Sequence, residues 1–237
     1  MPRFSIIIPA RNEEIWLPKC LDSVKQAGEQ FIGEYEVIVV VNRCTDRTEE
    51  IATSAGAVIV RNDSKILSCI RNAGAKVATG EVIVTIDADS RMTPGILGEV
   101  DRILKAGKYI GGGAMIFPER WSPGICFTAF FLIAYVAIRR QFGGMFWCYR
   151  KDFEAIGGFD EGIITAEDLD FSVRMRRHAR SMGKRVRMFT RNPIYTSMSK
   201  FDRFGDWHVF LNPRKVIKML RGESRKDADE YFYDFKR

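Results

Sequence analysis

The sequence lacks the signatures of several common protein classes. Its five cysteines are scattered and never spaced C-x-x-C, which argues against a disulfide framework or a zinc site and favours a reducing compartment. No G-x-G-x-x-G follows a predicted strand and no G-x-x-x-x-G-K-[ST] occurs, which argues against a dinucleotide dehydrogenase or a P-loop enzyme. Polar residues at 11–14 interrupt the first apolar run, so we expect no signal peptide and a cytoplasmic location.

The longest apolar run is also too short to cross a membrane. Residues 125–138 (ICFTAFFLIAYVAI) number 14, whereas a spanning helix needs about 20 residues. A buried helix is the simpler interpretation, and an interfacial helix followed by Arg139 and Arg140 is the alternative. The second interpretation predicts peripheral contact with the inner face of an anionic membrane.

Charge is distributed unevenly along the 237 residues. Residues 1–170 carry 19 Lys and Arg against 23 Asp and Glu, whereas residues 171–237 carry 18 against 7. A basic end predicts an anionic partner, either a phosphate-bearing substrate, nucleic acid or an acidic membrane, unless it is simply a solvated surface. It carries no RNA or DNA motif, so we expect no nucleic-acid partner. We expect one domain over residues 1–221 and a charged tail over 222–237.

The hydrophobic pattern predicts an α/β fold. The expected strands are 4–9, 35–41, 57–60, 82–86, 144–149 and 186–189, and the expected helices are 16–27, 46–55, 66–78, 93–107, 125–138, 166–182 and 207–220. Four successive repeats of strand, loop and helix favour a Rossmann-like, mostly parallel sheet flanked by helices. The last predicted helix would form a basic C-terminal helical extension.

Two acidic motifs stand where chemistry is expected. Asp87 and Asp89 follow a buried strand, and in an open parallel sheet ligands gather at the carboxyl ends of the strands. Their carboxylates can bind Mg²⁺ or Mn²⁺, with a diphosphate completing the coordination shell. Glu167 and Asp168 form the second motif, which fits either a helix cap or a carboxylate that accepts a proton from a substrate hydroxyl.

Five motifs, taken together and in order, resemble a known family. They are SIIIPARNEE at 5–14, NRCTDRT at 42–48, RNAGAKVATGEVIVTIDADS at 71–90, GGFDE at 157–161 and EDLDFSVRMRR at 167–177. In this order they resemble the family 2 glycosyltransferases, which are nucleotide-sugar-dependent enzymes with a single GT-A domain. The resemblance covers about three quarters of the chain.

The resemblance implies a role for each matching residue. The nucleotide base and ribose would contact Pro9, Ala10, Arg11, Glu13, Asn42 and Arg71, and the rest of the donor would contact Asp87, Ala88, Gly143 and Gly144. Asp89, together with Asp87, would bind a Mn²⁺ or Mg²⁺ ion that bridges the diphosphate. Asp168 would be the general base of an inverting transfer, and Glu167 would orient the donor or the acceptor.

One loop departs from the family pattern. The family commonly has an acidic pair after the second strand, where Val41 and Asn42 stand here. An amide can still donate to and accept from a base edge, so Asn42 stays a candidate. Asp46 in the same loop is either a helix cap or a ligand.

Three further candidates lie near the expected rim of the site. His208 is either an additional metal ligand, as in some GT-A enzymes, or a capping or packing residue. Lys200 and Arg203 would neutralise the diphosphate.

These residues favour a transferase that moves a sugar from a nucleoside-diphosphate sugar, preferably a UDP-sugar, to a saccharide or lipid-linked acceptor. A nucleotidyltransferase that makes nucleotide sugars is the first alternative, although it would normally have a glycine-rich basic loop after the first strand. A non-catalytic protein that binds anionic surfaces or nucleic acid through its basic end is the second.

Overall fold

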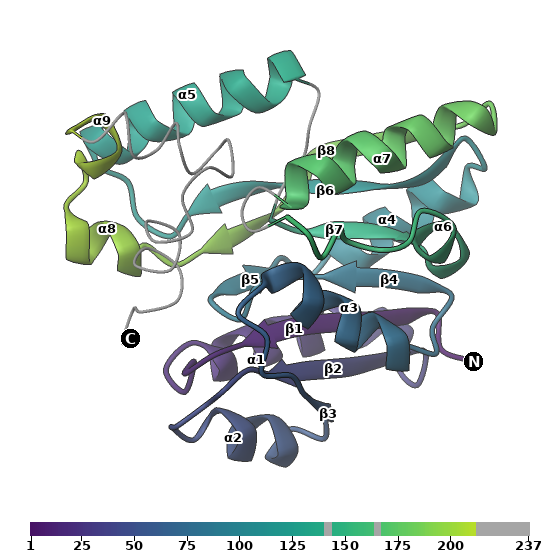
Figure 1. Ribbon diagram of the computed structural model, residues 1–237, viewed down its shortest axis with the longest axis horizontal. Coiled ribbons are helices and arrows are strands. Elements are labelled where there is room, and N and C mark those ends of the chain that lie inside the picture. Colours follow the sequence, from purple (N-terminus) through teal and green to yellow (C-terminus); the bar gives the residue numbers. More distant parts are fainter. Residues whose placement is uncertain (140–143, 164–166, 212–237) are drawn as a thin grey trace.

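The computed structural model describes residues 1–139, 144–163 and 167–211, which form a mixed α/β fold (Figure 1). The first half contains β1 (Phe4–Ala10), α1 (Leu17–Ala27), a 3₁₀ turn η1 (Glu29–Phe31), β2 (Tyr35–Val41), α2 (Thr48–Ser54), β3 (Val58–Arg61), α3 (Leu67–Val77), β4 (Val82–Thr85), β5 (Ser90–Met92) and α4 (Ile96–Lys105). The second half contains β6 (Tyr109–Pro118), α5 (Pro123–Arg139), β7 (Phe146–Tyr149), α6 (Arg150–Ala155), α7 (Glu167–Ser181), β8 (Arg185–Thr196), α8 (Ser199–Phe204) and α9 (His208–Leu211).

The described strands form one sheet in the order β3-β2-β1-β4-β7-β6-β8-β5. Strands β1 to β4 are parallel, because a helix crosses over between each strand and the next. Strand β7 runs antiparallel to β4 and β6, and β8 runs parallel to β6 and antiparallel to the short β5. The expected Rossmann-like, mostly parallel sheet is therefore confirmed, and it continues into a mixed half.

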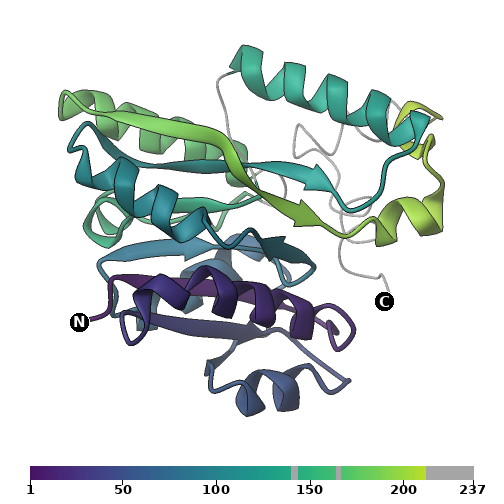
Figure 2. The same cartoon turned by 180° about the vertical axis from the view of Figure 1, so that it is seen from behind.

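Helices cover both faces of the sheet, which is why the strands are apolar on both sides. In β1, Ile6 and Ile8 pack into a core beneath α1 and α4, whereas Ile7 packs into a second core beneath α3, α6 and α7. Figure 1 shows the face with α3 and α7, and Figure 2 shows the face with α1 and α4. All three isoleucines are fully buried, as expected for a strand between two helical layers.

The second half contains strands that the sequence pattern did not predict. The three glycines at 111–113 lie inside β6, and β8 is three times as long as the expected strand at 186–189. A side chain on Gly112 would collide with the carbonyl oxygen of Arg187 on β8. The glycines therefore permit close approach within the sheet, in a strand that the sequence pattern did not predict.

The apolar helix α5 is not the buried helix that was the simpler expectation. Ile125 is buried, but Phe127, Phe130 and Phe131 expose 54%, 68% and 54% of their surface. Strand β5 and helix α6 were also not expected. The predicted helix at 207–220 is described only to Leu211, and the tail at 222–237 lies outside the described residues.

Candidate functional site

The loops that follow β1 and β2 are tied to each other at the carboxyl edge of the sheet. The Asn12 side-chain oxygen accepts a hydrogen bond from the Thr45 amide at 2.8 Å. The Glu13 amide donates to the Thr48 hydroxyl at 2.7 Å. Asn12 and Arg43 have positive φ, which lets both loops turn sharply back over the strand ends. Residues 9–13 and 42–48 consequently form one wall of the candidate site.

Two polar residues of this wall hold the loops in place. Asn42 is fully buried, and its amide nitrogen donates to the carbonyl oxygens of Asn62 (2.5 Å) and Ser64 (2.8 Å). Asp46 accepts from the Thr48 amide (3.0 Å) and hydroxyl (2.6 Å) at the start of α2, as in a helix cap. Although burial opposes ionisation, these hydrogen bonds lower the pKa of Asp46. Asp46 thus holds the turn just before α2, whose N-cap residue is Arg47 without a side-chain cap hydrogen bond.

The loop between β4 and β5 carries Asp87 and Asp89. The Asp87 side chain is 41% exposed, and one of its oxygens accepts a hydrogen bond from Arg71 at 2.8 Å. The Asp89 carbonyl oxygen accepts from the Ser197 amide at 3.0 Å, which ties the loop to the end of β8. Ala88 between them is buried in the core, which holds the backbone of this loop in place.

Arg71 on α3 joins the two acidic motifs. Its side chain is 3% exposed, and its two terminal nitrogens donate to Asp87 and to Glu167, each at 2.8 Å. Burial disfavours the charged guanidinium, but the carboxylates outweigh it and raise the pKa of Arg71. The guanidinium also lies 5.4 Å from the centre of the Phe159 ring. Arg71, which was expected at the nucleotide base, is therefore buried and held by the carboxylates of Asp87 and Glu167.

Asp168 follows Glu167 in the first turn of α7. Its side chain accepts a hydrogen bond from the Leu169 amide at 2.8 Å. Burial and the negative charge of Glu167 raise the pKa of Asp168 to about 7, against the attraction of Arg71. A carboxylate with such a pKa can take up a proton near neutral pH.

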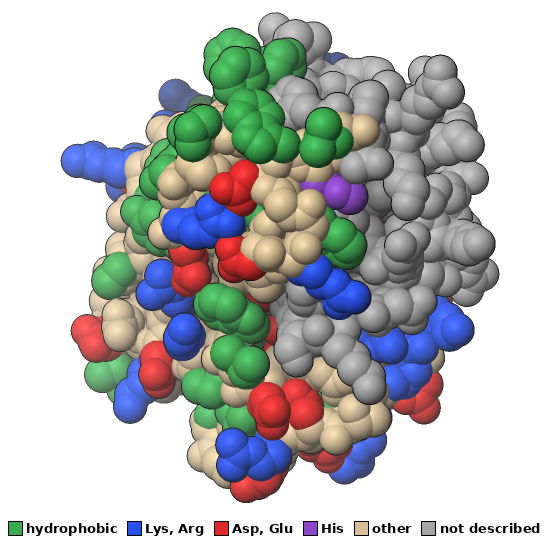
Figure 3. Space-filling model, turned by 90° about the vertical axis from the view of Figure 1, so that its left-hand side faces the viewer, with side chains coloured by type: hydrophobic (Ala, Val, Ile, Leu, Met, Phe, Trp, Pro, Cys, Tyr) green, Lys and Arg blue, Asp and Glu red, His purple; other side chains and the backbone are tan. Residues whose placement is uncertain are grey.

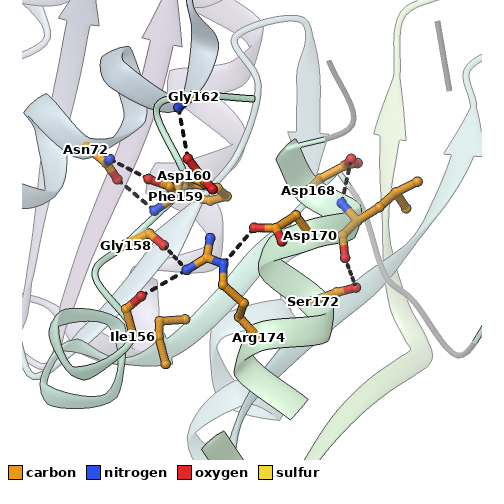
Figure 4. Close-up of polar contacts among 11 residues, drawn as sticks. Asn72, Ile156, Gly158, Phe159, Asp160, Gly162, Asp168, Asp170, Ser172 and Arg174 are labelled. Carbon is orange, nitrogen blue, oxygen red and sulfur yellow. Dashed lines mark hydrogen bonds and ion pairs between the residues drawn. The ribbon is translucent and has the colours of Figure 1, made fainter. Parts of the chain in front are cut away.

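The GGFDE segment is clamped between α3 and α7 (Figure 4). The Asn72 side chain accepts from the Phe159 amide at 2.9 Å and donates to the Phe159 carbonyl at 2.8 Å. Arg174 donates to the carbonyls of Ile156 (2.9 Å) and Gly158 (2.7 Å) and to Asp170 (2.6 Å). These contacts fix the start of α7, and with it Glu167 and Asp168, relative to α3.

Gly158 is required in this clamp for two reasons. Its φ of +67° is one that residues with a Cβ rarely adopt. A Cβ there would also lie 2.6 Å from the Asn72 side-chain oxygen. The second glycine of the segment is thus explained by the path of the backbone.

Other predicted site residues are not brought together in the same way. His208 on α9 lies against Phe204, with ring centres 5.0 Å apart, and no group of three or more His, Cys, Asp or Glu side chains suited to a metal occurs within the described ranges. The Arg203 guanidinium lies 5.6 Å from the Phe204 ring centre. Gly143 and the side chain of Lys200 lie outside what the structure describes.

The remaining candidates are Gly144 and the residues of the loop after β1. Gly144 has a φ of +81°, and a Cβ on it would collide with Ile116 on β6, so its backbone alone explains the glycine. Pro9 and Arg11 are half-buried and Ala10 is buried at the end of β1, while Glu13 is 7% exposed.

The carboxylates of Asp87 and Asp89 suit a divalent cation whose remaining ligands come from elsewhere. Both offer hard oxygen donors, and a Mg²⁺ or Mn²⁺ site often consists of one or two carboxylates, water and substrate phosphate. Asp87 and Asp89 would therefore suit a divalent metal that also binds substrate phosphate, with Asp87 held in place by Arg71.

Sequence reasoning missed the residues that organise the site. Asn72 and Arg174 clamp the GGFDE segment, and Thr48 joins the first two loops. Asn72 and Arg174 stand inside the quoted motifs RNAG and EDLDFSVRMRR, so the motifs held a signal. Their function required knowing that residues of α3 and of α7 both reach the GGFDE segment.

Comparisons with known proteins identify relatives in sequence. A model of the family described as glycosyl transferase family 2 matches residues 5–159, about two thirds of the chain. The undecaprenyl-phosphate 4-deoxy-4-formamido-L-arabinose transferase of Aeromonas hydrophila is 32% identical over 43% of this chain and 32% of its own. A PGL/p-HBAD biosynthesis glycosyltransferase of Mycobacterium bovis is 32% identical over 46% of this chain and 42% of its own. The chain thus spans less than half the length of these relatives.

Solved structures share the fold across nearly the whole chain. TarS from S. aureus in complex with UDP-GlcNAc has a TM-score of 0.68 at 17% identity and covers 99% of this chain and 71% of its own. A mannosyltransferase from Pyrobaculum calidifontis in complex with GDP-Man and Mn²⁺ has a TM-score of 0.68 at 21% identity. The match covers 94% of this chain and 63% of the mannosyltransferase. Glucosyl-3-phosphoglycerate synthase from Mycobacterium tuberculosis, in complex with Mn²⁺, UDP-Glc and phosphoglyceric acid, has a TM-score of 0.62 at 17% identity. The match covers 94% of this chain and 79% of the synthase. The predicted GT-A fold is confirmed.

Proposed function

The chain belongs to glycosyltransferase family 2, and we propose that it transfers a sugar from a nucleoside-diphosphate sugar, with a divalent metal on the diphosphate. The acceptor would be a hydroxyl or phosphate of a saccharide or of a lipid-linked molecule. The relative from Aeromonas hydrophila is named for an undecaprenyl-phosphate substrate, which supports the lipid-linked alternative.

One observation carries this proposal. Arg71 donates to Asp87 and to Glu167 with two hydrogen bonds of 2.8 Å each. These carboxylates belong to motifs that lie 80 positions apart in the sequence, one suited to a metal diphosphate and one to proton transfer. A glycosyl transfer needs both groups at one site, because the leaving diphosphate and the attacking hydroxyl meet at the same carbon.

The donor end of the site would use Asp87 and Asp89. Their carboxylates would hold the metal, while the loops after β1 and β2 would enclose the nucleotide. When bound, the metal would supply Lewis-acid stabilisation of the leaving nucleoside diphosphate. UDP is the favoured nucleotide, since two of the three solved structures named above hold a UDP-sugar, and GDP is the alternative suggested by the other.

The acceptor end would use Asp168 as the general base. The Asp168 carboxylate would take the proton of the acceptor hydroxyl as its oxygen bonds to the anomeric carbon of the sugar. The bond from that carbon to the diphosphate breaks, and its electron pair leaves with the nucleoside diphosphate, so the configuration inverts. Glu167 would be a positioning residue, because its carboxylate already accepts a hydrogen bond from Arg71.

Calorimetric titration with UDP and, in parallel, GDP tests the donor site, each with and without Mn²⁺. We expect one nucleotide to bind, binding to depend on the metal, and Asp89→Ala to weaken it at least about tenfold. Asp22→Ala is the matched control, since Asp22 lies exposed on α1. If neither nucleotide binds the wild type under any of these conditions, the proposal is wrong.

A further inference from the structure

Six large apolar side chains form an exposed surface at one end of the molecule, which we term the aromatic face. They come from α5, from the segment before it and from the segment around α9, and each exposes between 47% and 77% of its surface. They are Trp121, Phe127, Phe130, Phe131, Trp207 and Leu211. Figure 3 shows hydrophobic side chains gathered along the upper part of this end.

Ring contacts make the aromatic face one surface. The Phe127 ring centre lies 6.0 Å from that of Trp207 and 6.4 Å from that of Phe131. At the start of α5, a Cβ on Gly124 would lie 2.6 Å from the Asp206 carbonyl oxygen, so the helix packs directly on the turn before α9. Two segments some 80 residues apart thus present their aromatic side chains together.

The two sequence stretches that contribute the aromatic face carry charge of one predominant sign. The sequence contains no Asp or Glu between residues 121 and 139 or between 207 and 222. Arg139 and Arg140 follow the first apolar stretch, and four Lys and Arg lie within the second. The nearby carboxylates of Asp202 and Asp206 both pair with Arg120, at 2.6 and 2.7 Å, which offsets one of their two negative charges.

We propose that the aromatic face docks on the surface of an anionic phospholipid membrane. Trp and Phe side chains insert favourably at the boundary between headgroups and acyl chains, where a ring gains apolar contact. Each Lys or Arg near an anionic membrane adds attraction that salt weakens. Among the described residues, no helix has the length and hydropathy to cross a bilayer.

Docking of this face would place the candidate site beside the lipid surface. Helix α5 connects β6 to β7, and β7 pairs with β4, whose carboxyl end leads into the loop of Asp87. In Figure 1, α5, α8 and α9 lie toward the end of the molecule at which β1 and β2 finish. The docking surface is defined without reference to the donor site, so the two proposals stand or fall separately.

Cosedimentation of the full chain with vesicles tests the proposal, in the absence of nucleotide and metal. We expect binding to vesicles of phosphatidylcholine with phosphatidylglycerol, and at least about tenfold weaker binding to phosphatidylcholine alone or at high salt. The double variant Phe130→Ser/Phe131→Ser should lose at least about tenfold in partition coefficient. Ile32→Ser is the matched control, because Ile32 is 84% exposed but lies far along the chain from the aromatic face.

Two measurements separate lipid from the other occupants. Brominated lipids should quench wild-type tryptophan fluorescence, since Trp121 and Trp207 belong to the aromatic face. Absence of quenching and of cosedimentation would overturn the proposal. Concentration-dependent dimerisation in analytical ultracentrifugation that the double variant abolishes, without vesicle binding, would assign the face to a second copy of the chain instead. Circular dichroism checks that each variant is folded.

Discussion

Replacing Arg71 with Met tests the central contact of the site. Methionine fills similar space and keeps the apolar contact with the Phe159 ring, but it removes the charge and both hydrogen-bond donors. Glu167 and Asp87 would each lose an ion pair of 2.8 Å. The two carboxylates differ in what they lose, because the Glu167 side chain is 11% exposed and that of Asp87 is 41% exposed.

The difference in exposure between Glu167 and Asp87 decides how large a loss of unfolding free energy we expect. Removing one partner of a buried ion pair generally costs about 3–5 kcal/mol, because the other charge is left without compensation. Asp87 can regain water, and exposed pairs contribute little, so we assign the cost almost entirely to Glu167. We therefore expect the low end of the range, a loss of about 3 kcal/mol in the free energy of unfolding.

Urea denaturation at neutral pH measures this loss. Adding Glu167→Gln to Arg71→Met should recover a large part of it, because the uncompensated charge is then gone. Arg61→Met is the matched control: Arg61 pairs with Glu49, the two side chains are 75% and 37% exposed, and loss of this pair should not measurably change the unfolding midpoint. A wild-type unfolding midpoint for Arg71→Met, or a double variant less stable than the single one, would refute the reasoning.

Three further results follow from the same geometry. The pKa of Asp168, raised to about 7, predicts that kcat/KM rises with pH through about 7 as the carboxylate loses its proton, and Asp168→Asn should remove this limb while leaving nucleotide binding intact in calorimetry. Gly158→Ala should cost about 1–3 kcal/mol in unfolding free energy, whereas Gly183→Ala, with the same φ of +67° but open space, should cost less; equal losses would contradict the clash with Asn72. Asn42→Ala removes two buried hydrogen bonds and should lower the free energy of unfolding, measured by heat or urea, by about 2 kcal/mol. An unchanged free energy of unfolding would show that these two hydrogen bonds do not stabilise the loop.

The parallel half of the fold could be predicted because its pattern is local. Continuous apolar runs in β1, β2 and β4 are typical of strands buried on both faces. A helix with its own periodicity follows each of them, after the short β5 in the case of β4. The polar residues at the strand ends could then be placed at one edge without knowing any contact between distant residues.

The mixed half could not be predicted in the same way. Strand β6 contains three successive glycines, a residue depleted in strands. Gly112 is required by the backbone of β8, some 75 residues later, and Gly111 by the backbone of β7. In β8, Asn192 has a positive φ and Pro193 follows it, which hides the continuation of the strand to Thr196. Pairing partners that lie far apart leave little trace in a local pattern.

The same distinction applies to the site. Asp87, Asp89, Glu167 and Asp168 were candidates from their position in the sequence, and their roles stay predictions. The burial of Arg71 beneath two of them was not expected, because it depends on how α3 and α7 pack. Similarly, the sequence of α5, which is apolar on every side, left a buried and an interfacial helix both open.

The position of β8 in the sheet has a consequence during synthesis. This strand separates β6 from β5, and its register pairs Ser90 with Thr196. At about 5–20 residues per second, the ribosome needs roughly 4–16 s to make the chain between the end of β6 and the end of β8. Throughout that interval the hydrogen-bonding edges of β5 and β6 lack their final partner. The nascent chain therefore presents two open strand edges, and chaperones that shield such edges would act on this protein before residue 196 has emerged.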